Sequence, residues 1–420
     1  MDAMNNAYLG ANATAIALAL ASGVLYAQEP AYVTDVSFNH TTSQVDVELS
    51  LTIPKEVIEN NQITLFLNGS FDVASVEGET LSSHSSGASA QIPPWNEHVL
   101  EFKSGYDTHR VNFTYSGEIN VEDGHGNEVS GERIHLTIDS AWHPIFANLA
   151  TPMQGTVSIQ LDDSWRVYAP GSTSREESRV VLESASPQLD VAFFATQNDN
   201  VLEENGFSVI YDDANTQLAS ELSSVGATCL ASLNEKFGQN KPLDSASLVL
   251  LQRQGPSFAR ANFLSINSNN VQRPPFGYQL VCHELAHNWT AIGNVMSHDY
   301  WIPESFAELI GAREIQSQFG DDAYQSLKQS WQERADGTEF VWREDVQQRA
   351  SHRVNYGLGP LKLLQLEDRV GAQTFDQFIA NYMTSDITET TDLLDLLTSL
   401  TNSETAAWFE DQLATGDLNE

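Results

Sequence analysis

The sequence predicts an α+β protein in which an all-β, sandwich-like domain over residues 31–198 precedes a mostly helical domain over residues 199–420. Apolar residues recur with a period of two in the first half and with a helical period after about residue 199. A length of 420 residues exceeds one average domain and therefore also favours two. No low-complexity linker separates the halves, so we expect them to pack together.

The first half contains several strand patterns. The stretch "QVDVELSLTI" alternates apolar and polar residues from Val45 to Ile53, which is typical of a strand with one buried face, and "ERIHLTI" and "TVSIQL" repeat the pattern. Turn signals such as "LNGS", "EDGHGNE" and "APGSTS" separate these segments. The alternation therefore predicts an all-β, sandwich-like domain.

The second half begins with two further strands, "FSVIYDD" and "ASLVLLQ", and a long helix over 215–237 between them that ends at Gly238. Beyond residue 275 nearly every segment has a helical pattern. Segments 391–400 and 404–414 show it, as does the i, i+3, i+4, i+7 stripe of Phe375, Phe378, Ile379 and Tyr382.

Charge and targeting signals limit the classes of function. The chain has 20 Lys and Arg against 57 Asp and Glu, a formal charge of −37, which repels DNA, RNA and anionic membranes and so predicts no nucleic-acid partner. The apolar run at 13–25 is short for a membrane span and is followed by small residues up to Ala27, so residues 1–27 are predicted to be a signal peptide of a periplasmic or secreted protein. No basic residue precedes Lys55, and the alternative is a disordered or helical N-terminus of a cytoplasmic protein. No other stretch predicts an integral membrane segment.

The two cysteines do not by themselves define a pair. Cys229 falls on the apolar stripe of helix 215–237, and Cys282 adjoins a histidine. We predict buried free thiols, with a disulfide as the alternative.

The stretch "VCHELAHNW" at 281–289 carries the strongest chemical signal. His283 and His287 are four residues apart, so on a helix their rings face a common point, while Glu284 is offset from that face and can reach a water held there. A metal that does chemistry needs a third protein ligand and an open position. Cys282 lies about 100° from the metal face on a helix, so it does not complete a closed structural site.

Three residues downstream are candidates for the third ligand. His298 lies in "NVMSHDYW", which we predict to be a loop. Glu304 and Glu308 lie one turn apart on a predicted helix that starts near Pro303. One of them can bind the metal while the other accepts a hydrogen bond from a ligand imidazole.

These segments resemble the aminopeptidase N and leukotriene hydrolase family of gluzincins. "HELAHNWTAIGN" is similar to its H-E-L-A-H-[NQ]-W-[FT]-G-N segment, and "DYWIPESFAE" is similar to D-L-W-L-N-E-G-F-A. The resemblance implies a thermolysin-like catalytic domain with zinc held by His283, His287 and Glu304, and it places His298 on a non-ligand position. Glu308 and Asp299 are the implied supporting residues. The interval from His287 to Glu304 is 304 − 287 = 17 residues, two shorter than is usual in the family.

The resemblance spans about residues 140–385, with one family motif missing. "VNYGLGPLKLL" is similar to the family's Y-E-K-G-x-x-x-L, which implies that Tyr356 stabilises the transition state, whereas by itself it could be a packed aromatic. The family's exopeptidases carry G-x-M-E-N, whose glutamate grips the substrate amine. Here "SFARANF" offers Arg260 and Ala261 instead, and Arg260 would repel an ammonium or hold a substrate carboxylate.

The sequence thus predicts a zinc-dependent peptide hydrolase, and the family favours an aminopeptidase. Glu284 would take a proton from a metal-activated water, and Tyr356 would donate to the oxyanion. The alternatives are an endopeptidase, another zinc hydrolase of the same fold, or a non-catalytic binding protein that contains zinc.

Overall fold

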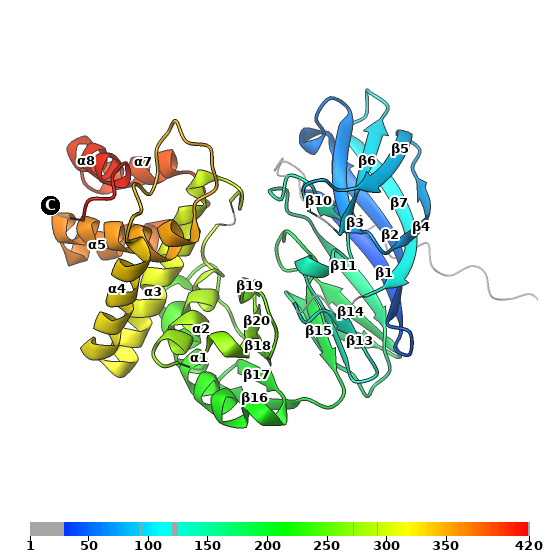
Figure 1. Cartoon of the computed structure of the whole chain (residues 1–420), viewed down its shortest axis with the longest axis horizontal. Coiled ribbons are helices and arrows are strands. Elements are labelled where there is room, and N and C mark those ends of the chain that lie inside the picture. The colour runs from blue at the N-terminus through cyan, green and yellow to red at the C-terminus, as the bar shows by residue number, and fades with distance from the viewer. Residues whose placement is uncertain (1–28, 93, 120–124, 272, 292, 419–420) are drawn as a thin grey trace, which may run out of the picture.

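The computed structural model describes residues 29–92, 94–119, 125–271, 273–291 and 293–418, so the predicted signal peptide lies outside the described residues. Figure 1 shows a β-rich half, coloured blue to green, beside a half that is mostly helical and continues to the C-terminus. This arrangement confirms the predicted fold class. Within the described residues no helix is both long and apolar enough to cross a bilayer.

The β-rich half contains one large sheet and two smaller ones. Strand β2 (Gln44–Pro54) pairs antiparallel with β1 (Ala31–Asn39) on one side and with β7 (Thr108–Glu118) on the other. As the alternation predicts, every second side chain of β2 from Val45 to Ile53 is buried, and these side chains share a core with the four-stranded sheet that contains β3 and β6. The remaining strands are β3 (Gln62–Asn68), β4 (Asp72–Glu77), β5 (Leu81–Ala88), β6 (Trp95–Phe102), β8 (Glu128–Val129), β9 (Arg133–Leu136), β10 (Ile145–Phe146), β11 (Gln154–Gln160), β12 (Arg166–Tyr168), β13 (Ser172–Glu176), β14 (Arg179–Glu183) and β15 (Phe193–Thr196).

A five-stranded sheet opens the second half. Its order is β16-β17-β18-β20-β19, in which β17, β18 and β20 run parallel and β16 and β19 are antiparallel edges. Helix α1 (Thr216–Phe237) connects β17 to β18, and the N–H of Gly238 bonds to Asn234 at its end, which confirms the predicted helix. The strands are β16 (Asn200–Glu204), β17 (Phe207–Tyr211), β18 (Ala246–Leu251), β19 (Phe258–Arg260) and β20 (Phe263–Asn267).

The rest of the chain is mostly helical, as predicted, although residues 336–351 contain no helix. His298 is not in a loop but in the short 3-10 helix η6 (His298–Tyr300), because Ser297 caps it by accepting from the N–H of Asp299. The α-helices are α2 (Phe276–Ala286), α3 (Trp301–Phe319), α4 (Asp321–Ala335), α5 (Gly359–Val370), α6 (Ala372–Met383), α7 (Thr390–Leu400) and α8 (Ser403–Leu413), with a π-helix, η7, at Val354–Leu358 and 3-10 turns at Lys55–Val57, Ile138–Ser140, Asp213–Asn215 and Ser268–Asn270.

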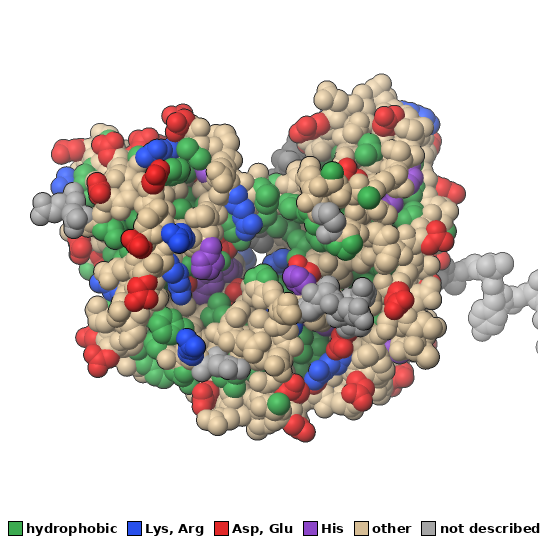
Figure 2. Space-filling model, viewed as in Figure 1, with side chains coloured by type: hydrophobic (Ala, Val, Ile, Leu, Met, Phe, Trp, Pro, Cys, Tyr) green, Lys and Arg blue, Asp and Glu red, His purple; other side chains and the backbone are tan. Residues whose placement is uncertain are grey.

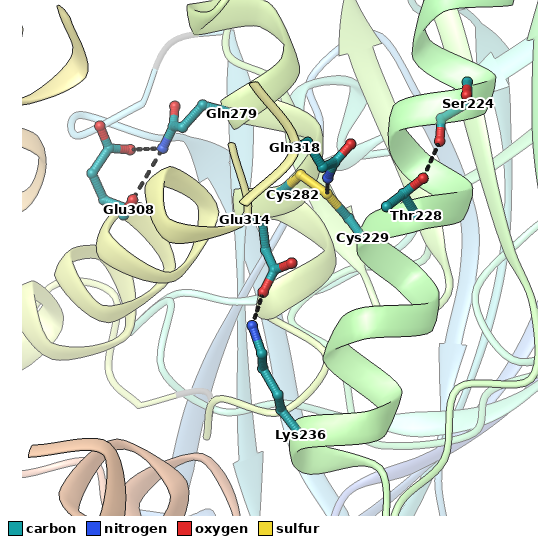
Figure 3. The surroundings of a disulfide bond; sticks show 9 residues. All are labelled: Ser224, Thr228, Cys229, Lys236, Gln279, Cys282, Glu308, Glu314 and Gln318. Atoms are coloured by element: carbon teal, nitrogen blue, oxygen red, sulfur yellow. Dashed lines mark hydrogen bonds and ion pairs between the residues drawn. A yellow bond between two sulfur atoms is a disulfide. The ribbon is translucent and has the colours of Figure 1, made fainter. Parts of the chain in front are cut away.

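The prediction of two free thiols is wrong. Cys229 on α1 and Cys282 on α2 form a disulfide with Cα atoms 5.6 Å apart, and both residues are fully buried (Figure 3). The apolar faces of α1 and α2 pack against each other, and this contact brings together two cysteines that are 53 residues apart in the sequence. Gln318 of α3 donates to the Cys229 sulfur at 3.2 Å.

Buried polar contacts join the two halves. The imidazole of His135 on β9 lies 3.3 Å from the hydroxyl of Ser265 on β20. At the turn between β19 and β20, the Asn262 side chain accepts from the N–H of Gly171 at 2.7 Å and donates to its carbonyl. These contacts fix the five-stranded sheet, including its edge strand β19, against the β-rich half.

Candidate metal centre

Helices α2 and α3 pack closely at the predicted metal site. Gly311 of α3 lies against the α2 backbone, since a Cβ atom there would be 2.9 Å from the carbonyl oxygen of Gln279 and 3.0 Å from the nitrogen of His283. Only glycine permits this approach without displacing backbone atoms. The close packing sets the carboxylates of α3 beside the histidines of α2.

Three side chains converge between these helices. His283, His287 and Glu304 each offer a ligand atom, and these atoms lie within 4.8 Å of one another. The two Nε2 atoms are 3.1 Å apart, and Glu304 carboxylate oxygens lie 3.5 Å from His283 Nε2 and 3.8 Å from His287 Nε2. Among the described residues this is the one group of three or more His, Cys, Asp or Glu with such spacing. Two imidazole nitrogens and one carboxylate oxygen are a donor set that suits catalytic zinc.

Each imidazole has an oxygen atom close to its other ring nitrogen. His283 Nδ1 lies 3.3 Å from Glu308 Oε2, and His287 Nδ1 lies 3.3 Å from the hydroxyl of Thr290. Such partners fix the orientation and tautomer of a metal-binding histidine. Glu308 thus occupies the supporting position considered in the sequence analysis. The contribution of Thr290 was missed, because the sequence does not show that α2 ends at Ala286 and turns back.

Glu308 is itself held by three donors. Its carboxylate accepts from the Gln279 amide at 2.7 Å, the Trp331 indole at 2.8 Å and the Arg334 guanidinium at 3.2 Å. Burial opposes ionisation of Glu308, but the hydrogen bonds and nearby cations outweigh it and lower its pKa. Glu308 therefore remains an anionic acceptor beside His283.

Glu284 is a buried carboxylate beside the cluster. Burial raises its pKa to about 7, with His283 opposing the shift and the charge of Glu304 adding to it. A carboxyl group with a pKa near neutrality can both accept and return a proton under ordinary conditions. Its place on α2, one residue after His283, is the one the sequence motif predicts.

Two tyrosines contact Glu304 from other elements. Tyr356 lies on the π-helix η7 and donates its hydroxyl hydrogen to Glu304, and its ring centroid is 5.7 Å from that of His283. Single π-helical turns are frequent at functional sites. Tyr300 of η6 also hydrogen-bonds to Glu304. Burial, together with the charge of Glu304, raises the pKa of both hydroxyls, so both remain donors. Tyr300 was missed, because its position matches a leucine in the family segment.

Three other residues considered from the sequence contact different partners. His298 lies 3.1 Å from the carboxylate of Asp299, which in turn accepts from the backbone and hydroxyl of Thr390 at the start of α7. The two residues therefore tie η6 to α7. Arg260 donates to Asp190 of the β-rich half, and both side chains are largely buried. The charge of Arg260 is thus paired within the chain.

The site lies where the two halves face each other. Figure 2 shows a hollow between them, with histidine and Lys or Arg side chains on its wall.

Comparison with known proteins extends this description. No family model matches the chain. Its structure is similar to the M1 zinc metallopeptidase from Deinococcus radiodurans, with a TM-score of 0.68 and 18% identity over 94% of this chain and 95% of that one. It is also similar to native yeast LTA4 hydrolase, with a TM-score of 0.69 and 14% identity over 91% of this chain and 66% of that one.

A third similar structure is a mutant of the Deinococcus radiodurans M1 zinc metallopeptidase bound to a Tyr-Ser-Ala substrate. Its TM-score is 0.64, at 16% identity over 94% of this chain and 95% of that one. Together these likenesses show that the chain has the same fold as these solved structures. The fold expected from the sequence resemblance is confirmed, and it is the two-part fold of the Deinococcus protein in particular, which this chain matches over nearly its whole length.

Proposed function

We propose that this chain is a zinc-dependent peptide hydrolase and that it acts as an aminopeptidase. The observation that carries the proposal is the convergence of His283, His287 and Glu304 beside the buried carboxyl of Glu284. The M1 fold and the Tyr-Ser-Ala complex of the Deinococcus protein support a peptide as the substrate.

Each residue has a distinct role in this proposal. A zinc ion bound by the three ligands would acidify a water and polarise the substrate carbonyl. Glu284, whose pKa lies near 7, accepts a proton from the attacking water and passes it to the leaving amine. The Tyr356 hydroxyl, which is hydrogen-bonded to Glu304, donates to the substrate oxygen that becomes negative in the transition state.

Metal analysis of purified variants tests the ligand set. We expect about one zinc per chain in the wild type, and its loss in His283→Ala, His287→Ala and Glu304→Ala. His298→Ala is the matched control and should keep its zinc, because His298 bonds to Asp299 outside the cluster. Full zinc in Glu304→Ala together with loss in His298→Ala would overturn the assignment.

A second variant separates chemistry from metal binding. Glu284→Gln should keep zinc and the fold while peptide hydrolysis falls by several orders of magnitude, because the base is lost and no ligand is removed. If this variant and the wild type are equally inactive on a broad peptide mixture, the protein binds zinc without catalysis.

The aminopeptidase assignment requires a carboxylate that pairs with the substrate amine, since a desolvated ammonium is costly to leave unpaired. Ala261 occupies the turn between β19 and β20 where the resemblance would place that acid. The test compares a short peptide with its N-acetylated form. Equal cleavage of both would move the enzyme to the endopeptidase class.

We also propose that the protein is exported to the periplasm or secreted. Disulfides persist in oxidising compartments, and the buried Cys229–Cys282 bond fits the signal-like sequence at residues 1–27. N-terminal sequencing of the protein from its native source should show a start near residue 28. An intact N-terminus in a cytoplasmic fraction would refute export.

A further inference from the structure

The segment between α4 and the π-helix contains three closely spaced arginines. Three arginines, Arg343, Arg349 and Arg353, lie within eleven residues, whereas the whole chain has 20 Lys and Arg in 420. The N–H of Ala350 bonds to the carbonyl of Ser297 at 3.3 Å, directly before η6. This bond holds the segment beside Tyr300, which contacts Glu304 of the cluster.

The three arginines differ in what they bind. Arg343 donates to the carbonyl of Ala414, and Arg353 donates to that of Asp336. Arg349 is exposed, and its guanidinium carbon lies 5.4 Å from the centre of the Tyr300 ring. Within the described residues no carboxylate forms an ion pair with Arg349.

Contact with an aromatic ring leaves a guanidinium able to bind an anion. A cation–π contact uses the ring face, while the N–H groups of the guanidinium lie in its plane and can form two parallel bonds to a carboxylate. The contact with Tyr300 also restricts the Arg349 side chain before a ligand arrives, which lowers the entropy cost of binding. A net charge of −37 disfavours anions at long range, but screening over about 8 Å at physiological salt leaves this local cation dominant.

The geometry places Arg349 close to the candidate metal site. The Tyr300 ring bridges Arg349 on one side and Glu304 on the other. The guanidinium is therefore separated from the metal-facing carboxylate by one aromatic side chain. Arg260 does not compete for the same group, because Asp190 already neutralises it.

We propose that the cleft selects peptides that carry a carboxylate near the scissile bond, and that Arg349, which contacts the Tyr300 ring, binds this carboxylate. The inference rests on the proposed peptide hydrolase function and names its substrate class. The carboxylate can be the free C-terminus of a short peptide or an acidic side chain. Both present the same chemistry to Arg349.

The kinetic test uses three peptides: Ala-Ala-Ala-Ala with a free C-terminus, its C-terminal amide, and an amidated peptide with Asp in the fourth position. We expect kcat/KM of the wild type to be about tenfold higher for the free acid than for the amide. In Arg349→Gln this ratio should fall to about one. Arg369→Gln is the matched control, because Arg369 on α5 is also exposed and its guanidinium carbon lies 5.4 Å from the centre of the Trp408 ring on α8. The ratio in this control should stay near ten.

The third peptide distinguishes the two sources of the carboxylate. A preference for the Asp peptide over the plain amide assigns the site to acidic side chains, and a preference for the free acid alone assigns it to C-termini. Equal kcat/KM for all three in the wild type, or a ratio that survives in Arg349→Gln, would overturn the proposal.

A binding measurement keeps this test separate from the proposed function. Calorimetric titration of Glu284→Gln with the same three peptides should show about tenfold tighter binding of a carboxylate-bearing peptide, and adding Arg349→Gln should remove the difference. If binding depends on Arg349 but the wild type hydrolyses none of the peptides, only the proposed hydrolase activity is refuted. Hydrolysis with no dependence on the carboxylate would refute only the role of Arg349.

Discussion

Replacing both Cys229 and Cys282 with alanine should lower the free energy of unfolding by about 4 kcal/mol. The bond closes a loop of 53 residues between α1 and α2. In the chain-entropy treatment, a loop of this length restricts the unfolded chain by about 14 cal/mol/K, or about 4 kcal/mol at 25 °C. Both cysteines are fully buried, so the lost sulfur atoms add a smaller packing cost.

Urea unfolding followed by tryptophan fluorescence measures this change, with the oxidised wild type and the double variant compared at equal protein concentration. Thr228→Ala is the matched control. Thr228 is exposed on the same helix and bonds only to the carbonyl of Ser224 at 2.9 Å, so its removal should change the free energy by less than about 0.5 kcal/mol (Figure 3). Wild-type protein reduced in denaturant should unfold like the double variant.

A thiol assay in denaturant checks the premise directly. The unreduced wild type should show no free thiols, and the reduced protein should show two. Two thiols before reduction, or a loss of less than about 1 kcal/mol in the double variant, would refute the reasoning.

Three further predictions concern the site and its surroundings. Tyr356→Phe should lower kcat by about a hundredfold with little change in KM, because its contact strengthens only in the transition state; near-normal turnover would remove it from the mechanism. Asp190→Asn leaves the Arg260 guanidinium buried without its partner, so urea unfolding should show a loss of roughly 3–5 kcal/mol, and an unchanged midpoint would show that the pair contributes no stability. Burial lowers the pKa of His135 and His143 to about 4, below the ordinary value of 6.5, so the unfolded chain binds more protons between these values and stability should fall as the pH falls through this window. The free energy of unfolding should fall by roughly 3 kcal/mol per histidine at pH 4. If this free energy changes equally in the wild type and in His143→Gln between pH 6.5 and 5, the reasoning is contradicted.

Local patterns in the sequence were sufficient for the elements and for part of the site. The alternation in "QVDVELSLTI" fixes which side chains of β2 face the core, because successive residues of a strand point to opposite faces. The spacing of His283 and His287 likewise brings two imidazoles to one face of α2, whatever else the chain does. Such patterns lie within one helix or strand, so the backbone geometry of that element determines which way its side chains point.

Contacts between elements were decided only by tertiary packing. The residues alone left His298, Glu304 and Glu308 open as the third ligand, and the family resemblance favoured Glu304. The approach of α3 to α2 at Gly311 places Glu304 at the imidazole nitrogens and Glu308 behind His283. The same kind of packing joined Cys229 to Cys282 and paired Arg260 with Asp190. A helix or strand pattern specifies which face is apolar but not which partner covers it. The sequence therefore determined the two halves and the paired histidines. The position of the third candidate metal ligand, the disulfide and the exposed guanidinium of Arg349 depended on distances set by the folded core.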